Sequence, residues 1–368
     1  MKHFSLFIGF FIFGFTLLAQ NSGNQYFYVG SYTSEGAEGI YLCKLNSGTG
    51  EIELENTFAG IENPSFVKLS PNKQNLYAVS EAGENGSFVY AYKVDNSKML
   101  EYLNKQSSGG QGPCHVDVSP DGKFVAVANY GGGAFSLYSV MEDGSIDPAV
   151  KTIRNSGAGP NTDRQSKPHA HSVKFSPFTG EIFNADLGTD QLNICHLENG
   201  TMVQHDQEFV KLPPGAGPRH FEFHPNGRVI YVINELNSTI STIQKKGDEW
   251  KVVDNISTLP NDFEGVSYCA DIHISEDGKF LYGSNRGHNS IAVFKVDQKD
   301  QSLSLLETVS VEGNWPRNFG ITPDGNWMLV ANQRSNNITV FKIDKKTGLL
   351  YYTGNQIELP SPVCVEFY

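Results

Sequence analysis

The sequence has few basic residues, which limits the partners that the protein can bind over its surface. Lys and Arg together number 28, against 40 Asp and Glu, so the formal net charge is −12. A chain of this charge is not expected to bind nucleic acid or an anionic membrane surface generally. A local cluster of arginines would still allow it to bind a small anion.

The sequence also lacks the motifs of disulfide-rich, metal-binding and nucleotide-binding proteins. Its five cysteines are far apart and form no C-x-x-C pair, so we expect buried free thiols within strands. There is no H-E-x-x-H motif, calcium-binding loop, G-x-S-x-G motif or nucleotide-binding glycine loop. His169 and His171 are two apart, but no cysteine or carboxylate lies at a suitable spacing beside them. We therefore predict neither a metal nor a cofactor.

No apolar run is long enough to be a typical membrane span. The longest, residues 4–18, follows Lys2 and His3 and ends at Ala19. A span needs about 20 residues, whereas a short apolar run after a basic residue and before a small one is typical of a signal peptide. We predict a signal peptide at residues 1–19 and export to the periplasm or the medium, with no membrane contact after its removal. An uncleaved anchor helix is the alternative.

Glycine and proline are plentiful, and they mark the turns of an internal repeat. A strand, a turn similar to Ser-Pro-Asp-Gly and a second strand recur about every 50 residues, and each pair is followed by a third strand and a more polar fourth one. The repeats begin at Asn63, Gly112, Lys167, Gly217, Cys269 and Trp315.

The two ends of the chain complete one more unit. Residues 26–31 and 39–45 match the second and third strands of the repeat, and residues 361–368 match its first strand. The sequence therefore predicts an all-β fold, a seven-bladed β-propeller over residues 20–368, closed by the C-terminal strand in the N-terminal blade. Two tandem β-sandwiches would leave the last strand unexplained.

Charged residues gather at the ends of the repeated strands. When the first strands are aligned on their turns, His171, Arg219 and Arg317 occupy one position, and Glu235 and Arg286 end the second strands. The symmetry of the repeat brings these positions to one mouth of the central channel. Arginine suits a carboxylate, a phosphate or a developing oxyanion, and a histidine can carry a proton near neutral pH.

Some polar residues of these strands have an equally good structural explanation. Propeller blades often use residues such as His115, His220, Asp271 and His273 to hold strands together. A Gly- and Asn-rich insertion at residues 155–166 is predicted to form a loop over the channel mouth.

The motifs GAGPRHFEFHPNGRVIYVINELN, KPHAHSV and ADIHISEDGKFLYGSNR resemble those of the seven-bladed propeller lactonases. That family includes the propeller-type 6-phosphogluconolactonase and the carboxymuconate lactonizing enzyme. The resemblance covers the mature chain and implies the catalytic residues His171, Arg219, Glu235 and Arg286. We add four candidates for contacts with the substrate or support of the site, namely Arg317, Asp186, His169 and His220.

The hypothesis that follows is hydrolysis of a small anionic lactone, with 6-phosphogluconolactone as the leading substrate. Water attacks the carbonyl, His171 or Glu235 accepts a proton, and an arginine such as Arg219 stabilises the oxyanion. Export is unexpected for a family that is usually cytosolic. Two alternatives are a muconate-type lactonizing isomerase and an exported propeller that only binds a partner.

Overall fold

Each sequence repeat folds as a hairpin whose turn depends on glycine. In the repeat that carries Arg219, strand β16 (Pro218–Phe223) pairs with β17 (Val229–Asn234) in antiparallel register. Gly227 in the turn has a φ of 69°, and its N–H donates to the carbonyl of His224 at 2.9 Å. This left-handed conformation is strained for other residues. The hairpin thus returns both of its polar ends to one edge of the sheet.

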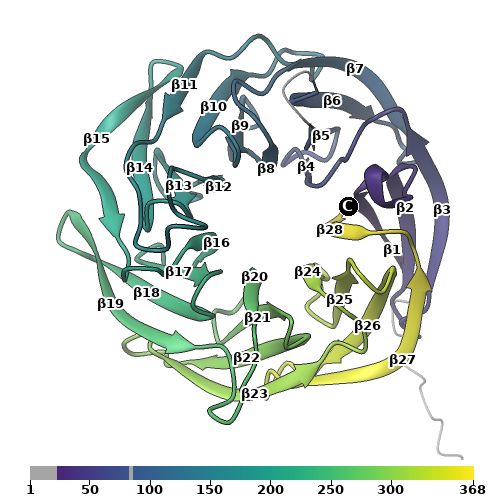
Figure 1. Cartoon of the computed structure of the whole chain (residues 1–368). Coiled ribbons are helices and arrows are strands. Elements are labelled where there is room, and N and C mark those ends of the chain that lie inside the picture. Colours follow the sequence, from purple (N-terminus) through teal and green to yellow (C-terminus); the bar gives the residue numbers. More distant parts are fainter. Residues whose placement is uncertain (1–22, 83–85) are drawn as a thin grey trace, which may run out of the picture.

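The computed structural model describes residues 23–82 and 86–368, so the predicted signal peptide at residues 1–19 lies outside the described residues. The described strands form seven sheets of four strands each. Figure 1 shows the sheets arranged as blades around a central channel, with β4, β8, β12, β16, β20, β24 and β28 nearest the axis. This arrangement confirms the predicted seven-bladed propeller.

Six blades consist of four consecutive strands, numbered outward from the channel. Their bounds are as follows: β4 (Val67–Leu69), β5 (Asn75–Ser80), β6 (Phe88–Val94) and β7 (Leu100–Ser107); β8 (Pro113–Val118), β9 (Phe124–Asn129), β10 (Ala134–Ser139) and β11 (Lys151–Arg154); β12 (Ala170–Phe175), β13 (Glu181–Asp186), β14 (Gln191–Glu198) and β15 (Thr201–Lys211); β16, β17, β18 (Thr239–Lys246) and β19 (Glu249–Ser257); β20 (Tyr268–Ile274), β21 (Phe280–Arg286), β22 (Ser290–Val296) and β23 (Leu303–Ser310); β24 (Pro316–Ile321), β25 (Trp327–Asn332), β26 (Asn337–Ile343) and β27 (Leu350–Glu358).

The remaining blade joins the two ends of the chain. Its strands are β28 (Pro362–Phe367), β1 (Asn24–Ser31), β2 (Gly39–Asn46) and β3 (Ile52–Ala59), in that order from the channel outward. A short 3₁₀ helix, η1 (Thr33–Glu35), connects β1 to β2. Strand β28 pairs with β1 in antiparallel register, as the sequence predicted.

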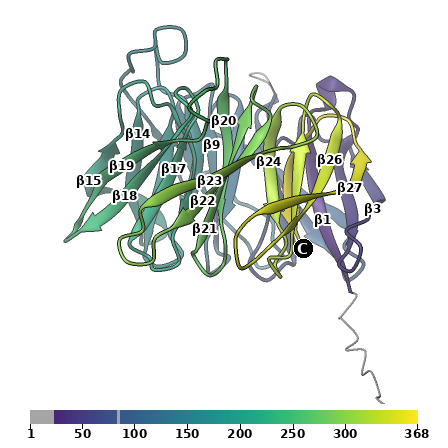
Figure 2. The ribbon, with the colours of Figure 1, turned by 90° about the horizontal axis from the view of Figure 1, so that it is seen from below.

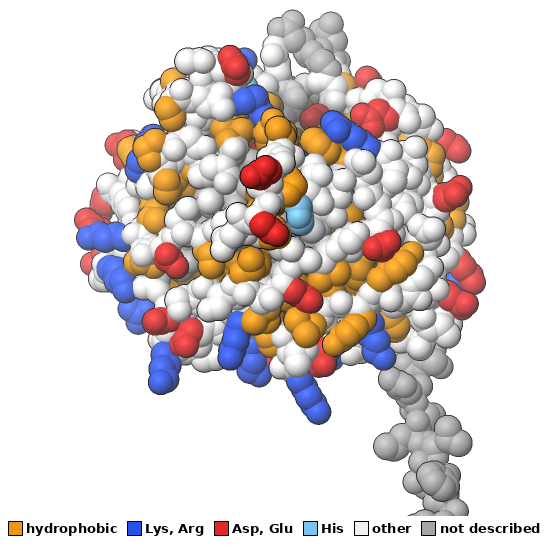
Figure 3. Space-filling model, turned by 60° about the horizontal axis from the view of Figure 1, so that its bottom comes forward, with side chains coloured by type: hydrophobic (Ala, Val, Ile, Leu, Met, Phe, Trp, Pro, Cys, Tyr) orange, Lys and Arg blue, Asp and Glu red, His pale blue; other side chains and the backbone are white. Residues whose placement is uncertain are grey.

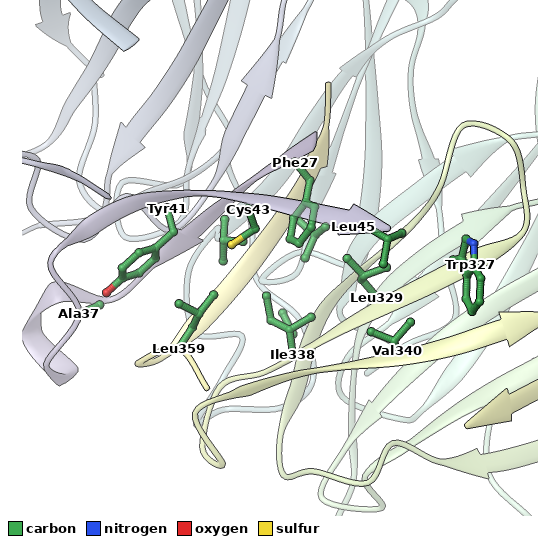
Figure 4. Packing of buried hydrophobic residues seen from close by; sticks show 13 residues of the cluster. Phe27, Ala37, Tyr41, Cys43, Leu45, Trp327, Leu329, Ile338, Val340 and Leu359 are labelled. Atoms are coloured by element: carbon green, nitrogen blue, oxygen red, sulfur yellow. The ribbon is translucent and has the colours of Figure 1, made fainter. Parts of the chain in front are cut away.

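Apolar side chains pack between neighbouring blades, and the closing blade is held in the same way. Phe27 and Cys43 from the closing blade contact a cluster that contains Leu329 and Ile338 from the preceding blade, all with no exposed surface (Figure 4). The same cluster contains Trp327, which is 5% exposed. Burial of this kind on both sides of every blade is the main stabilising contribution to the ring.

All five cysteines are free and buried, and each lies in a strand, as predicted. On the side of the molecule shown in Figure 3, acidic and basic side chains are interspersed and do not form one patch of a single sign. No described helix is long and apolar enough to cross a membrane.

Candidate active site

A small cavity of about 190 Å³ lies at one mouth of the central channel. Six blades contribute its lining: Glu81 follows β5, Cys114 lies on β8, Tyr130 follows β9, His171 lies on β12, Glu235 follows β17, Arg286 ends β21, Arg317 lies on β24, and Arg164 comes from the loop between β11 and β12. Pockets for drug-sized ligands start at about 300 Å³, so this cavity suits a small substrate. Two larger hollows, of about 740 and 770 Å³, contain none of the predicted site residues.

β-Bulges in the first strands position the residues of the site. The pairing with the second strand shifts register between Pro113 and His115, and the same shift recurs in three later blades. The residues that the shifts skip are Cys114, His171, Arg219 and Arg317. A bulge bends the strand and redirects one side chain, which explains why one aligned position supplies the site from several blades.

Glu235 lies at the centre of the charged cluster and is 5% exposed. Its Oε2 is 2.7 Å from Nη2 of Arg286 and 3.3 Å from Nε of Arg219. Its Oε1 is 2.6 Å from Nη2 of Arg164. Burial opposes ionisation of Glu235, but Arg286, Arg219 and Arg164 outweigh it and lower its pKa to about 2. Glu235 is therefore ionised throughout the neutral range.

Arg219 lies behind Glu235 and does not line the cavity. It is 2% exposed, and its Nη1 donates to the carbonyl of Ala270 and lies 3.3 Å from Nε2 of His220. Burial, followed by the like charges of Arg286 and Arg317, lowers the pKa of Arg219. Its position is that of a buried counterion to Glu235.

His171 is a neutral imidazole at the wall of the cavity. Its Nε2 is 4.0 Å from Oε2 of Glu235, and its ring meets that of Tyr130 edge-on with centroids 5.3 Å apart. Burial lowers its pKa well below 6.5, and Arg219, His220 and Arg317 add to the effect. The unprotonated ring can accept a proton, and Glu235 is close enough to stabilise the imidazolium that would form.

Glu81 and Arg317 also line the cavity, and Tyr32 joins them. The hydroxyl of Tyr32 donates to Oε2 of Glu81 at 2.8 Å and accepts from Nη2 of Arg317, also at 2.8 Å. Burial raises the pKa of the Tyr32 hydroxyl, so it stays protonated. The other guanidinium nitrogens of Arg317 make no hydrogen bond with described residues and are available to a ligand.

Asp186 and His169, two of the candidates for contact with the substrate or support of the site, support the loop that carries Arg164. We call residues 155–169 the arm; Figure 2 shows this teal segment between β11 and β12 projecting beyond one end of the ring. Asp186 is fully buried and accepts hydrogen bonds from the side chain of Asn155 and the N–H of His169. The His169 ring stacks on Tyr130, with centroids 4.4 Å apart. Neither residue lines the cavity.

His220 faces a separate hollow of about 300 Å³ in the channel. Its Nδ1 is 2.6 Å from Oδ1 of Asp271, and Oδ2 of Asp271 is 3.0 Å from Nε2 of His273 and accepts from the side chain of Asn318. These contacts join three neighbouring blades, as the structural explanation of His220, Asp271 and His273 expects. Burial and Arg219 lower the pKa of His220 to about 4, so it is neutral.

Sequence reasoning did not select Arg164, Tyr130, Tyr32 or Glu81. Glu81 ends a second strand and could have been found, because it occupies the repeat position that holds Glu235 and Arg286. Tyr130 directly follows Asn129, which occupies the same position. Tyr32 follows Ser31 as Glu81 follows Ser80, and its N–H donates to the carbonyl of Ser361 as that of Glu235 donates to Gly217, so Tyr32 also lies at this repeat position. Arg164 lies in the arm, outside the repeat, where the alignment gives no signal.

The comparison with known families agrees with this geometry. Residues 26–367 match the family model described as lactonase, 7-bladed beta-propeller. The chain belongs to the seven-bladed β-propeller lactonase family.

Relatives in this family span the whole fold. A protein of Bacillus subtilis named 6-phosphogluconolactonase is 38% identical over 92% of this chain and 97% of its own length. One of Formosa agariphila with the same name is 38% identical over 80% of this chain and 85% of its own. The solved structure of the Pseudomonas aeruginosa periplasmic gluconolactonase has a TM-score of 0.88 and 30% identity, covering 94% of this chain and 99% of that one.

No group of three or more His, Cys, Asp or Glu side chains that could hold a metal ion occurs in residues 23–82 and 86–368.

Proposed function

We propose that the protein hydrolyses a sugar lactone and that 6-phosphogluconolactone is its preferred substrate. The observation that carries the proposal is the cavity itself, where a neutral His171 lies beside an ionised Glu235 and the available guanidinium of Arg317. Two relatives of 38% identity that are named 6-phosphogluconolactonase support this substrate.

In the proposed reaction His171 acts as the general base. Water attacks the lactone carbonyl carbon while the imidazole accepts a proton, and Glu235, 4.0 Å away, stabilises the resulting charge. Arg317 donates to the oxyanion of the tetrahedral intermediate. Collapse of the intermediate breaks the bond to the ring oxygen, which takes the proton back from His171. The product is the open-chain acid with a free hydroxyl.

Arg219 and Arg286 act through Glu235 in this scheme. Nη2 of Arg286 also donates to the carbonyl of Cys269 at 2.9 Å, which leaves it little freedom to follow a substrate. The two arginines hold the carboxylate ionised and in place, so the charge that stabilises imidazolium is present before the substrate binds.

The test is a screen of purified protein against phosphorylated and plain aldonolactones, with spontaneous hydrolysis subtracted at each pH. We expect hydrolysis of 6-phosphogluconolactone, and its loss in His171→Asn and Arg317→Gln. Wild-type rates in both variants would contradict the mechanism. Inactivity on every lactone, together with cyclisation of a muconate, would favour the isomerase instead.

A second candidate substrate is the unphosphorylated gluconolactone. The observation in its favour is the structural likeness to the Pseudomonas aeruginosa protein, which is named a periplasmic gluconolactonase. The ratio of kcat/KM for the two lactones decides between the candidates.

We also propose that the protein is exported, on the basis of the apolar run at residues 4–18. Fractionation of the producing cells, with mass spectrometry of the mature N-terminus, tests this proposal. A protein that stays in the cytoplasm with its first 19 residues would contradict it.

A further inference from the structure

Arg164 is unlike the other arginines around Glu235, because it comes from the arm and not from a strand of the propeller. Its side chain is 36% exposed, whereas the side chains of Arg219 and Arg286 are 3% and 6% exposed. Its Nη2 contacts Oε1 of Glu235 at 2.6 Å and the hydroxyl of Tyr130 at 3.3 Å. Arg164 therefore lies where the cavity meets solvent.

The guanidinium of Arg164 has donors left for a ligand. Only Nη2 is engaged, and Nε and Nη1 make no hydrogen bond within the described parts of the chain. A guanidinium presents five N–H donors in a planar fork that matches the oxygens of a phosphate. Arg164 can bind an anion through Nε and Nη1 while its Nη2 stays paired with Oε1 of Glu235.

The arm that carries Arg164 is anchored next to this residue. Gln165 is fully buried, and its Nε2 donates to the carbonyl of Leu187 at 2.8 Å and to Oδ1 of Asp190 at 2.7 Å. The same Asp190 accepts the N–H groups of Gly215 and Gly217, both at 2.8 Å, in the segment that leads to Arg219. The position of Arg164 is thus fixed relative to Glu235, as recognition of one group of a substrate requires.

The charge of the site calls for an anion. Arg164, Arg219, Arg286 and Arg317 supply four positive charges against two carboxylates, Glu81 and Glu235, which leaves a formal charge of +2 while His171 is neutral. A neutral lactone leaves this charge uncompensated. When its carbonyl is placed between His171 and Arg317, the group on the opposite end of the substrate can reach Arg164, which lines the same cavity.

We propose that Arg164 is the specificity-determining residue that binds the phosphate of a phosphorylated lactone at the mouth of the site. This inference rests on the proposed lactonase function. In this proposal the arm distinguishes a phosphorylated from an unphosphorylated substrate, and the other residues of the site carry out the hydrolysis.

The test compares Arg164→Ala and Arg164→Lys with wild type on 6-phosphogluconolactone and on unphosphorylated gluconolactone. Loss of one charged hydrogen-bonding group should lower kcat/KM for the phosphorylated lactone about 10- to 100-fold, mainly through KM. The rate on the unphosphorylated lactone should fall by a smaller factor, because that lactone loses only the contact of Arg164 with Glu235, which Arg219 and Arg286 still hold. For Arg164→Lys, kcat/KM on the phosphorylated lactone should lie between the values for wild type and Arg164→Ala, because lysine keeps the positive charge but lacks the planar set of N–H donors. Arg154→Ala is the matched control, since exposed Arg154 lies on β11 and its side chain makes one hydrogen bond within the described residues, to the carbonyl of Gly109.

A binding measurement separates failure of this inference from failure of the proposed function. Calorimetric titration with 6-phosphogluconate and with gluconate needs no turnover, and Arg164→Ala should weaken only the binding of 6-phosphogluconate. Equal losses for both lactones would show that Arg164 acts through Glu235 alone, and equal binding of 6-phosphogluconate by variant and wild type would show that it does not bind phosphate. Either result overturns the inference, even where wild type hydrolyses the lactones. Inactive wild-type protein would overturn the lactonase function, and the titration would still decide the role of Arg164.

Discussion

At the scale of single residues, the protonation state of His171 decides how the activity depends on pH. Burial lowers the pKa of His171 well below 6.5, and Arg219, His220 and Arg317 add to the effect. Among the described residues, Glu235 is the one carboxylate within 4.0 Å of the His171 ring nitrogens. A general base fails when it is protonated. We therefore predict that kcat/KM stays level as the pH falls through 6.5 and declines only at more acid pH.

The measurement is kcat/KM on the unphosphorylated gluconolactone, which has no phosphate that titrates near pH 6, from about pH 5 to 8 at constant ionic strength, with spontaneous lactone hydrolysis subtracted. His171→Asn should lower kcat by about 10²- to 10⁴-fold, the usual contribution of a general base. An inflection of the wild-type profile at the ordinary histidine pKa would contradict a depressed pKa for the base.

Glu235 contributes to stability as well as to the reaction, because two of its arginine partners are almost completely buried. Glu235→Gln keeps the shape of the side chain and leaves Arg219 and Arg286 without their counterion. Loss of one partner of a buried ion pair costs about 3–5 kcal/mol. We predict a loss of this size in the free energy of unfolding, measured by urea denaturation at pH 7, together with loss of turnover.

The effect of Glu235 should also depend on pH in a defined direction. Its pKa is about 2 in the folded protein, below the usual 4.5, so its stabilisation is present above about pH 4.5 and is lost as the pH falls towards 2. The difference between wild type and Glu235→Gln should shrink over that range. Glu208→Gln, at an exposed position on β15, is the control and should match wild type throughout.

At the scale of structural elements, the arm depends on Asp186. Asp186→Asn would place an amide against the side-chain amide of Asn155, which now donates to the carboxylate, and would cost about 1–3 kcal/mol in the arm. We predict faster cleavage within residues 155–169 in limited proteolysis and a fall in kcat/KM of about tenfold. Asp206→Asn, exposed on β15, is the matched control. Lost activity with an unchanged cleavage rate would instead favour the sequence-based interpretation that Asp186 contacts the substrate.

The bulges and the arm show what an alignment of repeats can and cannot predict about the site. His171, Arg219 and Arg317 could be found because each occupies the same position in its repeat, and the bulge at that position gives each the same local geometry. Arg164 could not be found, because the arm has no counterpart in the other repeats and its course depends on long-range contacts of Gln165.

At the scale of the whole molecule, the fold was predictable because the turn signals recur at an almost constant spacing and the termini complement each other. The order β28-β1-β2-β3 is the arrangement that the orphan strand at the C-terminus implied. The separation of the channel into two hollows was not predictable. The two hollows share no lining residue, and this division depends on how side chains pack across blades, which the pattern of one strand does not encode.

Closure by β28 gives the last prediction. Its Val365 N–H donates to the side chain of Asn318 at 2.7 Å, and its Glu366 lies 3.0 Å from Nζ of Lys68, so the strand connects the blades on both sides of it. Deleting residues 361–368 should abolish cooperative urea unfolding, because the apolar faces of three blades become exposed. Since the N–H of Tyr368 donates to the carbonyl of Tyr26, the same eight residues can be joined by a short turn ahead of Asn24. That rearranged chain should unfold cooperatively, with a free energy of unfolding within about 1 kcal/mol of the wild-type value. A deletion variant that unfolds cooperatively at the wild-type midpoint would show that the ring does not depend on its closing strand.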